Sequence, residues 1–92
     1  MTRDEARAKW IAALRSGKHE QGFGSFEKRG RLCALMVAAR EIGFYIGRSA
    51  SVSRNTIQFF SVDADLCMRW NDFQFLTFPE IADRLEAGEA WV

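Results

Sequence analysis

The chain has 92 residues and a mass of 10.5 kDa, enough for one domain (residues 1–92) with a single core. An apolar fraction of 48% and a charged fraction of 27% are typical of a globular domain and exclude a disordered chain. A formal net charge of +1 does not favour a wholly basic nucleic-acid-binding protein.

The hydropathy pattern predicts a cytoplasmic protein that does not enter a membrane. No apolar run approaches the ~18 residues of a membrane helix, and residues 1–10 carry charges where a signal peptide would be apolar. Cys33 and Cys67 are too few for a disulfide framework or a zinc site, so we expect two small buried thiols.

Charge is divided unevenly along the chain. Residues 1–56 contain 11 Lys/Arg and 5 Asp/Glu, a balance of +6, whereas residues 57–92 contain 2 and 7, a balance of −5. Two faces of opposite charge would steer a charged partner; the alternative is that the two parts neutralise each other within the fold. The candidate binding residues are the basic Lys28, Arg29, Arg31, Arg40, Arg48 and Arg54 and, on the acidic side, Asp63, Asp65 and Asp72.

A first helix is predicted between Thr2 and Gly17. Thr2 and Glu5 have the spacing of a capping box, and apolar residues then recur at helical spacing. Gly17 suits the left-handed conformation that ends many helices.

Residues 17–30 contain four glycines and predict tight turns instead of a helix. The main expectation is an irregular loop packed over the core and held by Gln21 and its neighbours. The alternative is that the backbone amides near Gly22 and Gly24, followed by basic residues, bind an anion such as a phosphate. The P-loop pattern itself is missing.

A second helix is predicted over residues 31–42. Two segments rich in aromatic and β-branched residues follow, 44–49 and 56–62, and the polar residues 50–55 separate them. This arrangement predicts a short β-hairpin packed on the helices.

A third helix is predicted over residues 63–70, followed by an Asn71-Asp72 turn. The last helix begins at Thr77, which forms a second capping box with Glu80. The sequence thus predicts a mainly α fold of the α+β class, a compact domain of about four short helices with a small β-hairpin and a glycine-rich loop.

The sequence indicates no catalytic or metal site. The only histidine, His19, would need Cys33 as a nucleophile and Asp72 as an orienting acid. Cys33 lies in an apolar segment where burial raises the pKa of a thiol, so we expect a solvated loop histidine instead. Asp63 and Asp65 are two positions apart and would not face one ion on a helix. We expect no enzyme, no metal and no cofactor.

The aromatic content, 3 Trp and 8 Phe, is high for this length. Most of these side chains are expected in the core, and any that are exposed would anchor an interface. The candidates for exposed anchors are Trp91, Phe73 and Phe75, and the candidates for stacking on a nucleic acid are Tyr45, Phe59 and Phe60.

Two stretches resemble a group of small phage and prophage proteins of unassigned function: WIAALRSGKHEQGFGSFEKRGRLCALMVAA (10–39) and WNDFQFLTFPEIADRLE (70–86). That group pairs a W-x2-ALxSG-x3-QGxG pattern with a Cys-containing helix, an Asn-Asp turn and TF-x-EIAD-x-IE. The resemblance covers the two ends of the chain and not its middle. Where many members have Cys-Cys-Leu-Gly, residues 33–36 read Cys-Ala-Leu-Met, so no role for paired thiols carries over. The matching positions are Trp10, Leu14, Ser16, Gly17, Gln21, Gly22, Gly24, Leu32, Cys33, Asn71, Asp72, Thr77, Phe78, Glu80, Ile81, Ala82 and Asp83.

The resemblance implies a phage origin and a compact, mainly helical domain, with no attached activity. Small phage accessory proteins often act by occupying a surface of a host complex, and anti-CRISPR inhibitors of bacterial defence are an example. We therefore expect a non-enzymatic phage protein in the host cytoplasm that binds a host protein or complex, with inhibition of bacterial defence as its specific form. The alternative is a nucleic-acid or nucleotide-phosphate binder that uses the glycine-rich loop and the basic half.

Overall fold

A computed structural model describes residues 1–43 and 52–92 of the chain. Within these residues the protein forms five helices and one two-stranded antiparallel sheet, so the predicted mainly α architecture with a small β component is confirmed. The elements in chain order are α1 (Arg3–Ser16), β1 (Glu27–Lys28), β2 (Arg31–Leu32), α2 (Ala34–Ile42), α3 (Arg54–Phe60), α4 (Ala64–Asp72) and α5 (Phe78–Glu86).

The predicted capping motifs of the first and last helices are confirmed. Thr2 Oγ1 accepts a hydrogen bond from the backbone N–H of Glu5, and Glu5 Oε1 accepts from the N–H of Thr2. Thr77 and Glu80 form the same reciprocal pair at the start of α5. Gly17 ends α1 at φ 75°, in the left-handed region. These caps form because each needs only residues three positions apart.

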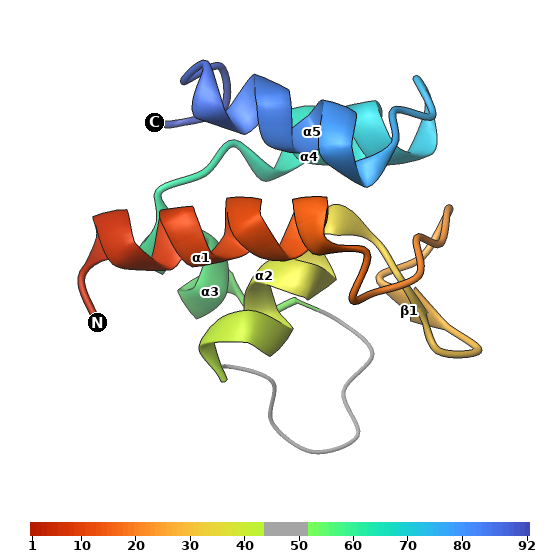
Figure 1. The fold of residues 1–92 in the computed structure, drawn as a ribbon, viewed down its shortest axis with the longest axis horizontal. Coiled ribbons are helices and arrows are strands. Elements are labelled where there is room, and N and C mark those ends of the chain that lie inside the picture. Colours follow the sequence, from red (N-terminus) through yellow and green to blue (C-terminus); the bar gives the residue numbers. More distant parts are fainter. Residues whose placement is uncertain (44–51) are drawn as a thin grey trace.

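Helix α1 lies at the centre of the fold, between α4 and α5 on one side and α2 and α3 on the other (Figure 1). Its Trp10 is 0% exposed, and the indole Nε1 donates a 2.9 Å hydrogen bond to the carbonyl of Ala34. The Trp10 ring lies 5.1 Å from the ring of Phe60 and 6.1 Å from that of Trp91, between ring centroids. One side chain thus joins α1 to α2, α3 and the C-terminal segment.

The predicted hairpin over 44–49 and 56–62 is wrong in its second half, because residues 54–60 form helix α3. Ser53 caps this helix by accepting from the N–H of Thr56, and the helical spacing buries both Thr56 and Phe60. Tertiary burial therefore overrides the β propensity of this segment. The other predicted strand, 44–49, lies outside the described residues.

The sheet instead forms inside the glycine-rich segment, where Glu27 pairs with Leu32 and Lys28 with Arg31. Helix α2 consequently begins at Ala34 and not at residue 31 as predicted.

The predicted Asn71-Asp72 turn is also displaced along the chain, since α4 continues through Asp72. The reversal occurs in residues 73–77, where Phe75 has φ 54°. None of the helices in the described ranges is both long and apolar enough to span a bilayer.

Candidate functional site

The β-hairpin places three cationic side chains at its tip. Arg29 (φ 54°) and Gly30 (φ 79°) form the two-residue turn, and positive φ at both positions is the pattern of a type I′ turn. Lys28 and Arg31 flank the turn as directly opposed residues, so their side chains lie on the same face of the hairpin. The sequence KRGR therefore concentrates positive charge at one end of the molecule.

The glycine-rich loop packs directly on the second strand of this hairpin. The N–H of Gly22 donates to the carbonyl of Leu32 over 2.8 Å, and the N–H of Leu32 donates to the carbonyl of Glu20 over 2.9 Å. A Cβ atom on Gly22 would lie 2.9 Å from Cβ of Arg31. Gly22 is therefore required for a close approach of two backbone segments.

The loop and the hairpin border a depression of about 470 Å³. Within the described chain, no carboxylate lies within ion-pair distance of Lys28 or Arg29. Arg31 Nε is 3.6 Å from Glu20 Oε2, but both side chains are exposed, and such surface pairs contribute little. The lining residues are Glu20, Gly22, Phe23, Lys28, Arg29 and Arg31.

One exposed aromatic ring lines the depression, and a second packs against it. Phe23, in its wall, is 49% exposed, and Phe75, in the α4–α5 connection, is 63% exposed. Their ring centroids are 5.5 Å apart at an interplanar angle of 61°. The loop and the α4–α5 connection lie at the same end of the molecule in Figure 1. We call Phe23, Phe75, Lys28, Arg29 and Arg31 the aromatic-basic surface.

A partly buried amide network holds the two segments of this surface together. Gln21 Nε2 donates to Asn71 Oδ1 (2.9 Å) and to the carbonyl of Leu76 (2.7 Å), while Gln21 Oε1 accepts from the N–H of Phe78 (3.1 Å). Asn71, only 1% exposed, donates from Nδ2 to the carbonyl of Gly22 (2.9 Å). The predicted role of Gln21 in holding the loop is confirmed, and Asn71 adds a contact that the sequence did not predict.

Asp72 completes the network and bears on the phosphate-loop alternative. Its Oδ1 accepts from the backbone N–H of Gly24 (3.0 Å) and from Asn71 Nδ2 (2.7 Å). The amides of Gly22 and Gly24 are thus both engaged within the protein, and a carboxylate occupies the position that an anion would need. A phosphate cradle built from these two amides is wrong; the cationic side chains remain as the candidate anion contacts.

The other candidate basic residues do not join this cluster. Arg40, in α2, pairs with Glu27 of β1, and Arg54 is exposed in the first turn of α3. Arg48 lies outside the described residues.

The candidate acidic residues of α4 do not converge on one point. Asp63 caps α4 by accepting from the N–H of Leu66 (3.1 Å), Asp65 is exposed in the first turn, and Asp72 is its last residue. Nine positions place Asp63 and Asp72 ~13 Å apart along the axis and on opposite sides of the helix.

Ion pairs neutralise only part of the uneven charge inside the fold. Arg15 of α1 contacts Asp83 (2.8 Å) and Glu86 of α5, which joins the basic part of the chain to the acidic part. Lys18 pairs with Glu41 at 3.0 Å within the basic part itself. Among the ion pairs of the described residues, those of Arg15 are the ones that join the two parts, so most of the uneven charge is retained.

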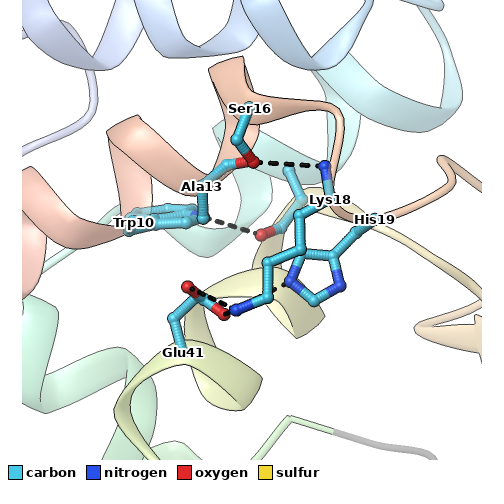
Figure 2. Close-up of polar contacts among 7 residues, drawn as sticks. Trp10, Ala13, Ser16, Lys18, His19 and Glu41 are labelled. Atoms are coloured by element: carbon cyan, nitrogen blue, oxygen red, sulfur yellow. Dashed lines mark hydrogen bonds and ion pairs between the residues drawn. The ribbon is translucent and has the colours of Figure 1, made fainter.

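His19 is not the solvated residue that the sequence predicted. Its side chain is 16% exposed and Nε2 lies 3.3 Å from Glu41 Oε2, beside the Lys18 ammonium (Figure 2). Partial burial raises the pKa of Glu41, but hydrogen bonds from Lys18 and His19 outweigh it and bring this pKa below its ordinary value.

The residues considered for catalysis contact different partners. His19 contacts Glu41, whereas Asp72 contacts Gly24 and Asn71. Both cysteines are buried; burial raises the pKa of the Cys33 thiol and raises that of Cys67 to about 12. Across residues 1–43 and 52–92, no cluster of three or more His, Cys, Asp or Glu could hold a metal ion.

The predictions about exposed aromatic residues are correct for some residues and wrong for others. Phe73 (76% exposed) and Phe75 are exposed as predicted. Trp91 is not, because Arg7 lies 4.0 Å above its ring and Trp10 packs against it. Phe60 is 0% exposed and cannot stack on a ligand, Phe59 is half-buried, and Tyr45 lies outside the described residues.

Phe23 was missed by the sequence interpretation, although its position between two loop glycines was a usable signal of exposure. The Arg-Gly turn was missed because arginine is an uncommon residue at positive φ. In comparisons with protein-family models, curated proteins and solved structures, no match was found. The resemblance to small phage proteins stays a prediction.

Proposed function

We propose that this protein is a non-enzymatic binding protein whose aromatic-basic surface contacts a partner protein. The specific form we propose is a phage accessory protein that acts on a host protein or complex in the host cytoplasm, as an inhibitor of bacterial defence. The phage and defence parts of this proposal rest on the resemblance of the two terminal stretches.

The observation that carries the proposal is the exposed Phe23–Phe75 pair. Two phenylalanine rings pack on each other while about half or more of each remains in water. The Gln21–Asn71 network holds the backbone beneath them, so the rings are presented by a rigid support. Rigid aromatic side chains of this kind are typical anchors of protein interfaces.

A second candidate function has one specific observation in its favour. Lys28, Arg29 and Arg31 line the same depression as the Phe23 ring, a combination that also suits a single-stranded nucleic acid. The edge-to-face contact between Phe23 and Phe75 covers part of each ring and leaves less face for a base to stack on. The formal net charge of +1 also favours the protein partner.

The test is an affinity capture from host lysate, with and without nuclease, using the wild type and a Phe23→Ser/Phe75→Asn double variant. We expect the wild type to retain one protein at near-stoichiometric yield after nuclease treatment, and the double variant to lose it. Val92→Ser removes an apolar side chain that is 79% exposed at the C-terminus and serves as the matched control.

Two results would contradict the proposal. One is a captured protein that the double variant retains as well as Val92→Ser does. The other is capture that disappears with nuclease and falls steeply with salt, which would favour the nucleic-acid alternative.

A further inference from the structure

Two residues of the aromatic-basic surface occupy a backbone conformation that their side chains disfavour. Arg29 and Phe75 both have φ 54°, in the left-handed region. Glycine and asparagine adopt this conformation at lower energy, and a bulky residue there is a marked exception. The fold itself therefore does not explain why arginine and phenylalanine stand at these two positions.

Ser61, at φ 53°, provides the contrast. Its backbone ends α3, and its N–H donates to the carbonyls of Ile57 and Gln58. Its Oγ also donates to the carbonyl of Val92, so this side chain contributes to the fold. The Arg29 side chain has no carboxylate partner among the described residues, and the Phe75 ring, 63% exposed, packs on the exposed Phe23 ring of the same surface.

We propose that Arg29 and Phe75 are the two principal contact residues of the interface, and that the partner presents carboxylates beside an apolar side chain. This inference rests on the proposed function. The ring of Phe75 would take the apolar contact together with Phe23. The Arg29 guanidinium would bind a carboxylate through two parallel hydrogen bonds, with Lys28 and Arg31 beside it.

The charge at the depression supports an acidic partner. Three cationic side chains line it against one acidic residue, Glu20, which is exposed and 3.6 Å from Arg31. Strain retained at exposed positions is typical of residues selected for binding and not for stability.

The experiment measures stability and binding on the same variants. Arg29→Asn and Phe75→Asn place a residue suited to positive φ at each position, so we expect the melting temperature to stay the same or rise. The binding probe is a fluorescent peptide of alternating glutamate and leucine, and we expect each variant to weaken its binding about thirtyfold. Lys9→Asn, which removes an exposed cation on α1, is the control and should bind as the wild type does.

Two further probes identify the ligand chemistry. A peptide of alternating glutamine and leucine should bind much more weakly than the glutamate peptide, because it has no carboxylates. An oligothymidylate of the same total charge should also bind more weakly; tighter binding of this probe would overturn the inference in favour of a nucleic acid.

Other outcomes overturn the inference without touching the proposed function. These are a glutamate peptide that does not bind, binding that Arg29→Asn leaves unchanged, or a clear fall in melting temperature in both asparagine variants. If lysate capture still depends on Phe23 and Phe75 in such a case, the protein partner stands and only its acidic character is wrong.

Discussion

Gly22 lies where the glycine-rich loop crosses the second strand of the hairpin. A methyl group there would lie 2.9 Å from Cβ of Arg31 and 3.2 Å from its backbone carbonyl carbon. We expect Gly22→Ala to lower the free energy of unfolding by about 1–3 kcal/mol, because the two backbone segments must separate. Urea unfolding followed by circular dichroism measures the change.

The control for this prediction is Gly24→Asn. Gly24 has φ 81°, a Cβ atom added there would have no neighbouring atom within 4 Å, and asparagine tolerates this conformation. A loss at Gly24 as large as that at Gly22 would show that backbone conformation, and not close contact, makes glycine necessary in this loop.

The glycines of this loop show which features of single residues a sequence pattern can predict. Four glycines in 14 residues predict tight turns, and that prediction is correct at Gly24 and Gly30, where φ is positive. Gly22 is needed for a different reason, contact with a strand nine positions further along the chain. Spacing along the sequence does not reveal such a contact.

At the scale of elements, Glu41 ties the end of α2 to the loop that follows α1. Its carboxylate accepts hydrogen bonds from Lys18 and its side chain is 9% exposed. Because the pKa of Glu41 is lowered in the fold, the charged form stabilises the protein at pH values above the ordinary 4.5. This contribution is lost as the pH falls through the lowered pKa.

We expect Glu41→Gln to remove that part of the pH dependence. Urea unfolding near neutral pH should show a less stable variant, and in strong acid the difference from the wild type should shrink because the wild-type carboxyl is then protonated. An equal difference at both pH values would mean that the charge of Glu41 does not stabilise the contact between the two segments.

Some helices are determined by residues close together in the sequence, and others by contacts between distant residues. Helices α1 and α5 begin at capping boxes that involve residues three positions apart, and both were predicted at the correct residue. Helix α3 has a Ser53 cap of the same kind, but its aromatic and β-branched residues favoured a strand. The burial of Phe60 against Trp10 decides in favour of the helix, and that contact joins residues 50 positions apart.

For the whole molecule, Trp10 is a core side chain that joins several elements. It is fully buried, and its contacts reach Ala34, Phe60 and Trp91. We expect Trp10→Ala to lower the free energy of unfolding by about 3–5 kcal/mol, a large share of the stability of a domain this small. Chemical denaturation checks the value.

Trp10→Phe separates the ring from its hydrogen bond. The variant keeps an aromatic ring in the core but leaves the carbonyl of Ala34 without the indole N–H, which costs about 1–3 kcal/mol. If Trp10→Ala were no more destabilising than Trp10→Phe, the packing of this ring would not be what joins the elements.

The candidate site shows the same division between local and distant determinants. The sequence predicts the exposure of Phe73 and Phe75 because both lie at the turn expected between the last two helices. The sequence does not predict that Phe75 packs on Phe23 beside the hairpin cations. The Gln21–Asn71 contact that joins these segments links residues 50 positions apart.

By itself, the sequence determined the caps of α1 and α5, the mainly helical class and the burial of both cysteines, because these depend on residues near one another or on apolar character alone. Only the tertiary structure decided that residues 54–60 are a helix, that the hairpin forms at residues 27–32, and that cations and exposed rings meet on one surface. The physical reason is that, in these segments, burial and long-range hydrogen bonds contribute more free energy than local propensity.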